Sequence, residues 1–330
     1  MPRRHHDGPP SDHFDGERFF NPGHPPTDRS LRDILRWRRT SVARPWPDAV
    51  PVHPAQPASR VSGLRVSVVG HATLLIQAAG RNLLTDPVWS NRAGPFGRLG
   101  PRRVAAPGIR FEALPPIDAV LLSHSHYDHL DLPTLRRLHD RDAPLLAMPL
   151  GVDRIVRRAI PAARVAVGDW HGRLPLAPGL STVLTPAHHW SARGPGDRRR
   201  SLWCGHWLDT PAGSVWFAGD TGYGNGALFR DLRARHGSPD LALIPIGAYE
   251  PRWFMGAQHV DPAEAVRILL DTGARRALGI HCGTFRLTDE GRDDPPAALR
   301  AALAAAAVPF DRFVPAEPGA VHDVVAPPGA

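Results

Sequence analysis

The residues best suited to chemistry are three histidines and an aspartate within six positions, in the order His-x-His-x-Asp-His. An apolar run at residues 119–122 precedes them and predicts a buried strand that ends in a polar loop. His124 and His126 can point the same way at the end of this strand. Asp128 and His129 fall in the turn and can face a second point. Imidazole and carboxylate are ligands for zinc, iron or manganese, so one loop could bind two metal ions.

Complementary side chains follow other predicted strands. His189, Asp220 and His281 each lie at or shortly after the end of an apolar run. Functional groups collect at such positions because a rigid sheet holds them while loops leave room for a substrate. Adjacent residues of an extended chain point in opposite directions, so we expect only one of His188 and His189 to be a ligand. A carboxylate can bridge two cations, which suits Asp220.

The ligands form two sets around a shared carboxylate. We predict His124, His126 and His189 for one metal, Asp128, His129 and His281 for the other, and Asp220 with a hydroxide between them. Each metal then keeps an open position, which is typical of a catalytic rather than a structural site. Two metals about 3.5–4 Å apart stabilise the attacking and leaving oxygens of a displacement. Asp128 and Asp220 are accordingly the predicted catalytic carboxylates.

The composition is that of an ordinary soluble globular chain. Its 330 residues suffice for one large domain or two small ones. No apolar run approaches the roughly 18–20 residues of a membrane span, and the first residues lack the apolar segment of a secretory signal. Cys204 and Cys282 are too few for a disulfide framework, which favours a cytoplasmic setting. The net charge of +8 is compatible with attraction to an anionic membrane surface, or with an arginine-rich composition alone, and we expect no nucleic-acid partner.

The chain divides into a lead-in, one large domain and a short tail. Residues 1–60 form a partly disordered lead-in, in which residues 30–39 predict a short basic amphipathic helix. That helix can lie on a lipid surface or pack on its own domain. Residues 61–325 form the predicted metallo-hydrolase domain, and residues 326–330 form a frayed tail. Many predicted strands are sequential neighbours, so the expected α/β fold has two mixed sheets face to face with helices outside.

The order of these motifs resembles the metallo-β-lactamase superfamily and, within it, the family of N-acylphosphatidylethanolamine-hydrolysing phospholipases D. The resemblance covers roughly residues 64–290. Its most specific stretches beyond the metal motif are Gly70-His71-Ala72-Thr73, residues 217–223, residues 244–255 and residues 258–262. The family pattern assigns His189, beside Trp190, as the ligand. Two positions depart from the pattern, since His188 stands where the family usually has Gln and Cys282 where it usually has Trp.

The resemblance implies an αββα sandwich, two zinc ions and hydrolysis of a phosphodiester by a hydroxide between the metals. The expected substrate is an N-acylphosphatidylethanolamine-like lipid, cleaved to phosphatidic acid and an N-acylethanolamine. Two alternatives stay open: hydrolysis of another bond, such as a lactone, amide or nucleotide ester, and metal binding without turnover. Peripheral contact with an anionic membrane would bring the chain to a lipid substrate. The sequence leaves the oligomeric state open.

Residues around the ligands are predicted to support them or to contact substrate. Substrate contacts are expected from Tyr127, His188, Tyr249 and Arg252. Tyr127 could instead pack in the core, and Arg252 could instead pair with a carboxylate of its own chain. Asp86 and His71 are expected to orient metal ligands through hydrogen bonds. The alternatives for them are a turn residue and a buried structural histidine.

Overall fold

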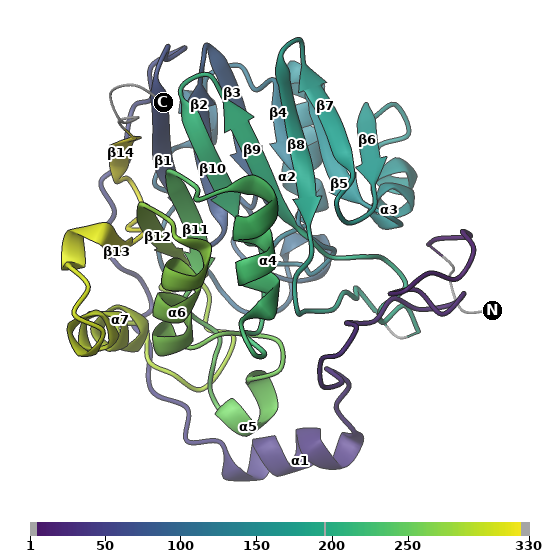
Figure 1. Ribbon diagram of the computed structural model, residues 1–330, viewed down its shortest axis with the longest axis vertical. Coiled ribbons are helices and arrows are strands. Elements are labelled where there is room, and N and C mark those ends of the chain that lie inside the picture. The colour runs from purple at the N-terminus through teal and green to yellow at the C-terminus, as the bar shows by residue number, and fades with distance from the viewer. Residues whose placement is uncertain (1–4, 195, 325–330) are drawn as a thin grey trace.

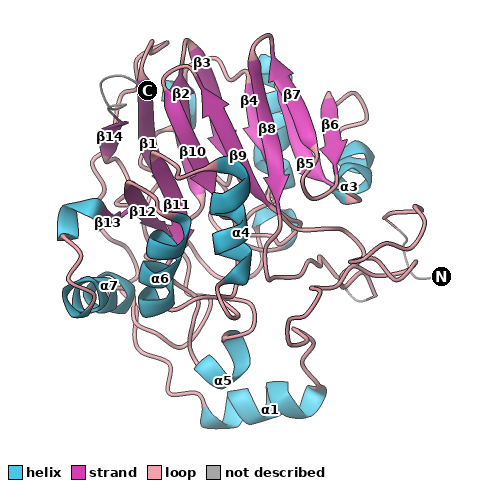
Figure 2. Ribbon diagram, in the orientation of Figure 1, coloured by secondary structure: helices cyan, strands magenta, loops and turns pink. Residues whose placement is uncertain are grey.

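Two seven-stranded β-sheets pack face to face, and helices cover their outer faces (Figures 1 and 2). The computed structural model describes residues 5–194 and 196–324. The arrangement confirms the predicted αββα sandwich of two mixed sheets. The predicted tail at residues 326–330 lies outside the described residues, and the domain boundary at residue 60 stays a prediction.

The first sheet has the strand order β14-β1-β2-β3-β4-β5-β6. Strands β3 to β6 run parallel, and the other neighbours pair antiparallel. The strands are β1 (Leu64–Gly70), β2 (Thr73–Ala78), β3 (Arg81–Thr85), β4 (Ala119–Leu121), β5 (Leu145–Pro149), β6 (Val165–Gly168) and β14 (Val321–Val324). Its outer face packs against α2 (Leu132–Asp142) and α3 (Val152–Ala159).

The second sheet has the strand order β13-β12-β11-β10-β9-β8-β7, parallel from β10 to β13 and antiparallel elsewhere. The strands are β7 (Arg173–Ala177), β8 (Leu180–Thr185), β9 (Gly205–Thr210), β10 (Gly213–Phe217), β11 (Leu241–Pro245), β12 (Arg276–Ile280) and β13 (Phe313–Pro315). Its outer face packs against α4 (Ala227–His236), α6 (Pro262–Thr272) and α7 (Asp294–Ala305). The other helices are α1 (Leu31–Thr40), α5 (Arg252–Met255), η1 (Pro95–Gly97), η2 (Phe111–Ala113) and η3 (Phe310–Arg312).

Alternation of side chains along the strands builds three apolar layers. In β2, Leu74 and Ile76 face the space between the sheets, whereas Leu75 faces α2 and α3. In β11, Leu243 faces the other sheet, and Ile244 packs with the helices outside. Successive side chains of a strand point to opposite faces, so a strand that is apolar throughout is buried on both sides. The two sheets therefore form a rigid support for the loops at their edges.

The topology brings the carboxyl ends of the site-bearing strands to one edge of the sandwich. In the first sheet, β1 and β3 both pair antiparallel with β2, and β4 runs parallel to β3, so these three strands end on the same side. In the second sheet, β8 and β10 both pair antiparallel with β9, and β12 runs parallel to β10 through β11. The segments after β4, β8, β10 and β12 carry every predicted metal ligand.

Part of the lead-in, which was expected to be partly disordered, packs closely on the domain. Phe14 and Phe19 are buried in an apolar cluster with Leu202 and Trp203. The predicted basic helix is present as α1, and none of its residues is buried. Among the helices in the described part of the chain, none combines the length and apolar character needed to cross a membrane.

A glycine turn delivers the predicted bridging carboxylate. Gly219 follows β10 with a φ of 63°, in the left-handed region that favours glycine. A Cβ atom at this position would lie 2.8 Å from the carbonyl oxygen of Cys204 and 2.9 Å from the Cβ atom of Ser123. The surrounding chain therefore leaves no room for a side chain immediately before Asp220.

We predict that Gly219→Ala destabilises the fold more than Gly80→Ala does. Both glycines have positive φ, but nothing lies within 4 Å of a Cβ atom built at Gly80. The Gly80 variant therefore reports backbone strain alone, about 1–2 kcal/mol, while the contacts at Gly219 add roughly 1–3 kcal/mol of overpacking. Denaturant titration measures both free energies of unfolding, and equal losses would contradict this account of the turn.

Candidate metal centre

Three imidazole nitrogens meet beside the loop that follows β4. His126 Nδ1 lies 2.8 Å from His124 Nε2 and 3.2 Å from His189 Nε2. His124 and His189 are buried, and His126 is half-buried. The structure thus brings together the first predicted set, although His189 comes from the other sheet.

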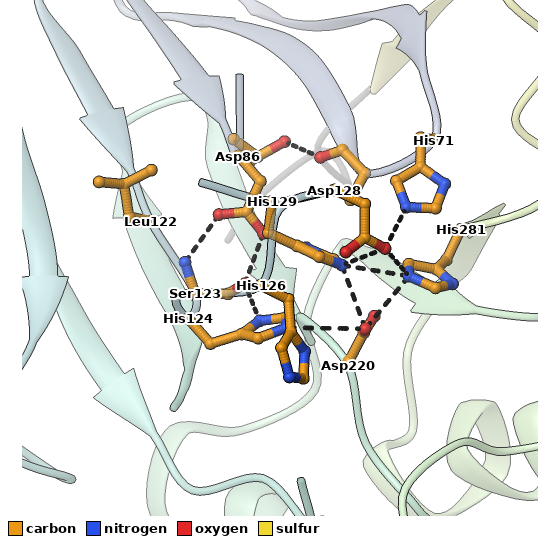
Figure 3. Close-up of polar contacts among 12 residues, drawn as sticks. His71, Asp86, Leu122, Ser123, His124, His126, Asp128, His129, Asp220 and His281 are labelled. Carbon is orange, nitrogen blue, oxygen red and sulfur yellow. Dashed lines mark hydrogen bonds and ion pairs between the residues drawn. The ribbon is translucent and has the colours of Figure 1, made fainter. Parts of the chain in front are cut away.

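A second group of ligating atoms lies next to the first (Figure 3). His129 Nε2 and His281 Nε2 are 3.1 Å apart. Asp128 Oδ2 lies 3.5 Å from the former and 3.3 Å from the latter. His71 Nε2 donates a hydrogen bond to the same carboxylate oxygen at 3.0 Å. This is the second predicted set with His71 added.

The carboxylate of Asp220 lies between the two sets (Figure 3). Its Oδ2 atom is 3.1 Å from both His129 Nε2 and His281 Nε2. The same atom is 3.9 Å from His124 Nε2 and 3.8 Å from His189 Nε2. Asp220 Oδ1 is buried and has no hydrogen-bond partner among the described residues. Asp220 therefore occupies the position that a bridging ligand requires.

Three rings use their outer nitrogens as hydrogen-bond donors, which turns their inner nitrogens toward the site. Ser123 Oγ donates to Asp86 and so accepts from His124 Nδ1, at 2.9 Å. His189 Nδ1 donates to a main-chain carbonyl oxygen at 3.0 Å. His129 Nδ1 donates to Asp86 Oδ2 at 2.7 Å. A neutral histidine whose proton points away from the site presents a lone pair toward it, which is how metal-binding histidines are oriented.

A cation fits this arrangement of donors. Nitrogen lone pairs 2.8–3.2 Å apart repel one another unless a proton or a metal ion lies among them. A buried carboxylate oxygen without a partner is also costly. A divalent metal ion offsets both effects, and imidazole with carboxylate is the donor set of zinc, iron and manganese. The residues present therefore fit the kind of metal predicted from the sequence.

The pKa values of the histidines are shifted in opposite directions in the two ligand sets. Burial lowers the pKa of His126 and of His189 to about 3, so both rings are neutral, the form that binds metal, at neutral pH. Burial also opposes charge on His281, but Asp220 and Asp128 outweigh it and raise the pKa of that ring to about 9. The same two carboxylates also outweigh burial at His129 and raise the pKa of that ring well above its usual value. Protons on His129 and His281 are therefore the species that a metal ion in the second set displaces.

Asp86 and His71 lie where the supporting roles predicted for them require. Asp86 orients His129, and His71 donates to Asp128. His71, Asp86 and His281 have positive φ values of 57°, 30° and 63°. Left-handed backbone is strained in residues other than glycine and clusters at functional sites. Here it turns the chain sharply after β1, β3 and β12.

Two of the predicted substrate contacts border the ligands. Tyr127 donates its hydroxyl hydrogen bond to the carbonyl oxygen of Arg193 at 2.6 Å and lines a cavity of about 1090 Å³. The ring of His188 stacks on that of His24, with centroids 3.9 Å apart. Of the two adjacent histidines, only His189 therefore joins a ligand set, as predicted.

The other two predicted substrate contacts lie outside the ligand cluster. Tyr249 lines a separate cavity together with Glu250. The guanidinium of Arg252 donates to Glu264 at 2.7 Å and to the carbonyl oxygen of His259 at 2.8 Å. Groups at the start of α6 therefore occupy the donors of Arg252. This matches the alternative of a structural ion pair and not the expected contact with phosphate.

Sequence reasoning missed Gln258 and His259. Gln258 supplies the carbonyl oxygen that orients His189. His259 is buried, its ring centroid lies 5.0 Å from that of His189 and 5.4 Å from that of His281, and its Nδ1 atom has no hydrogen-bond partner among the described residues. Both residues follow α5 rather than a strand, so the strand-end pattern did not point to them. The family-specific stretch at residues 258–262 contains both residues and is the signal that could have pointed to them.

Comparison with known proteins places the chain in a family. Residues 81–282 match the family described as the β-lactamase superfamily domain. An uncharacterized protein of Mycobacterium tuberculosis is 36% identical over 311 residues, which cover 89% of this chain and 81% of that protein. N-acyl-phosphatidylethanolamine-hydrolyzing phospholipase D 1 of Caenorhabditis elegans is 35% identical over 265 residues, which cover 77% of this chain and 74% of the nematode protein.

The fold recurs in a solved structure of low sequence identity. A possible metal-dependent hydrolase from Veillonella parvula has a TM-score of 0.63 at 15% identity, over 79% of this chain and 99% of that one. The family match spans more than half of the chain and includes the ligands from His124 to His281. The chain therefore belongs to the metallo-β-lactamase superfamily and is a metal-dependent hydrolase of that fold.

Proposed function

We propose that the chain is a phospholipase D that cleaves N-acylphosphatidylethanolamine-like lipids between phosphorus and the ethanolamine oxygen. The observation that carries the proposal is the pair of ligand sets around Asp220, because a two-metal site suits displacement at phosphorus. The relative from Caenorhabditis elegans bears the name of this activity. The products would be phosphatidic acid and an N-acylethanolamine.

Two zinc ions are the proposed cofactors, with iron or manganese as alternatives. The two sets of ligands would hold one ion each, and Asp220 would contact both. When bound, the ions would supply Lewis acidity, which activates water and offsets negative charge on phosphoryl oxygens. The chain itself presents unprotonated nitrogens from both sheets. The partly exposed ligands, His126 and Asp128, mark the side from which a substrate can approach.

The cavity beside Tyr127 is lined by none of the predicted metal ligands, so it offers room for the acyl part of a lipid substrate and not for the bond that is cleaved. Its volume of about 1090 Å³ exceeds that of most small-molecule pockets. Phe96 and Ile155 contribute apolar walls, and the guanidinium groups of Arg98 and Arg158 contribute positive charge. Apolar walls suit an acyl chain, and arginines suit the anionic part of a phospholipid.

Helix α1 supports peripheral contact with an anionic membrane. Leu31 and Leu35 are 78% and 50% exposed, and Arg36 lies over the ring of exposed Trp253 at 4.3 Å. Figure 1 shows α1 and α5 side by side at one end of the molecule. Exposed apolar side chains beside arginines are typical of helices that bind at a lipid interface.

Metal content should distinguish the two adjacent histidines. His189 Nε2 faces the first set, whereas the His188 ring stacks on His24, so we expect His189→Ala to lose one of about two bound metal ions and His188→Gln to lose none. Elemental analysis of protein purified without chelator measures this. The opposite ranking, or less than one metal ion per wild-type chain, would reject the ligand assignment.

The wild-type chain should cleave N-acylphosphatidylethanolamine in mixed micelles, and mass spectrometry should identify both products. In oxygen-18 water the label should enter phosphatidic acid, because the attack is at phosphorus. Asp220→Asn keeps the shape of the side chain but removes its charge. It should lower turnover more than about 100-fold. Removing even a hydrogen-bond partner outside the ligand shell lowers metal affinity or activity about 10- to 100-fold.

Two results would refute this function. Turnover of short soluble diesters without turnover of any phospholipid would refute the lipid substrate. Label in the N-acylethanolamine would refute attack at phosphorus.

Charge introduced on α1 should weaken membrane binding. Burying an exposed leucine in lipid contributes about 1 kcal/mol or more, so the double variant Leu31→Glu, Leu35→Glu should bind phosphatidylglycerol vesicles at least roughly tenfold more weakly. Leu270→Glu is the matched control, because Leu270 is 43% exposed on α6. Vesicle sedimentation measures the partition. Equal binding by wild type, double variant and control would show that α1 is not the contact.

A further inference from the structure

The lead-in reaches the metal centre through Asn21 and His24, which belong to neither ligand set. Figure 1 shows this segment running beside the loops at the strand ends. Asn21 Nδ2 donates to the main-chain oxygen of His189 at 2.9 Å, and Asn21 Oδ1 accepts from Trp203 Nε1 at 3.0 Å. His24 Nε2 donates to the main-chain oxygen of Ala257 at 2.6 Å.

These contacts lie beside both ends of the hydrogen bond between His189 and Gln258, which orients the His189 ring. His189 Nδ1 donates to the carbonyl oxygen of Gln258 at 3.0 Å, so the direction of His189 Nε2 depends on the loops that carry these two residues. His24 binds both loops at the neighbouring positions. Its Nε2 atom contacts Ala257, directly before Gln258, and its ring stacks on His188 with an interplanar angle of 9°.

The segment that carries Asn21 and His24 is fixed on both sides. Before them, Phe19 is buried in the apolar cluster. After them, Asp28 accepts hydrogen bonds from Arg198 at 2.6 Å and from Arg199 at 2.8 Å. Side chains on an anchored segment can hold a ligand in one geometry, as a supporting layer around a site must.

We propose that Asn21 and His24 are positioning residues of the metal centre, which fix the main chain around His189 so that its Nε2 atom points at the metal. This inference rests on the proposed metal centre but not on the proposed substrate. Hydrogen-bond partners outside the ligand shell usually alter metal affinity by 10–100-fold. A segment that only docks on the domain would alter stability and leave the bound metal unchanged.

Cobalt titration of the full chain, followed by visible absorption, tests the proposal. Asn21→Asp keeps an acceptor for Trp203 Nε1 but cannot donate to His189. One of the bound cobalt ions should therefore bind about 10- to 100-fold more weakly, with an altered spectrum. Asn91→Asp makes the same charge change at an exposed asparagine whose side chain makes no hydrogen bond in the described part of the chain. It should titrate as wild type does.

His24→Phe is the second variant, in case Asn21→Asp does not fold. A phenyl ring retains the stack on His188 but cannot bind the Ala257 oxygen, so weaker cobalt binding is again expected. Wild-type cobalt affinity and spectrum in the folded variants would overturn the proposal, even if their melting temperatures fell. Because no substrate is involved, a wild-type chain that binds two cobalt ions but cleaves no phospholipid would refute the substrate alone.

Discussion

The structure depends on the burial of a carboxylate and several unprotonated imidazoles at one point between the two sheets. Asp220 lies 3.1 Å from two ring nitrogens of the second set and keeps one oxygen without a partner. Removing such groups from water is unfavourable unless a cation compensates. Burial of strands that are apolar on both faces offsets this cost. Tight turns such as the one at Gly219 deliver the buried groups to the site.

Hydrogen bonds to the ring nitrogens that point away from the site orient the ligands. Asp86 accepts hydrogen bonds from His129 Nδ1 and from Ser123 Oγ, which in turn accepts one from His124 Nδ1. One buried carboxylate thereby sets the direction of a ring in each ligand set, because each ring must then turn its Nε2 atom inward. The lead-in adds a hydrogen bond from Asn21 to the main-chain oxygen of His189.

Much of this centre could be predicted from the sequence because its ligands directly follow apolar strands. The spacing from His124 to His129 and the polar residues after β8, β10 and β12 are visible locally. Strands β7, β9, β13 and β14 and helices α4 and α5 were not predicted. Strand β13 has only three residues, and β7 and β14 lie at sheet edges with exposed side chains, so their patterns are weak.

Contacts between distant segments could not be predicted in this way. Arg252 lies beside Tyr249 in a family-specific stretch, yet its partner is Glu264 at the start of α6. His259 has no strand before it, and only the folded chain brings it to His189. Phe14 and Phe19 are isolated apolar residues in a polar segment, and their burial depends on a partner cluster around Trp203.

Anomalous X-ray diffraction from crystals of the zinc-loaded protein tests the central claim most directly. The account predicts two zinc peaks about 3.5–4 Å apart. One peak should be ligated by His124, His126 and His189, and the other by Asp128, His129 and His281, with the Asp220 carboxylate between them. A single peak, or two peaks of which only one contacts Asp220, would contradict the shared-carboxylate centre.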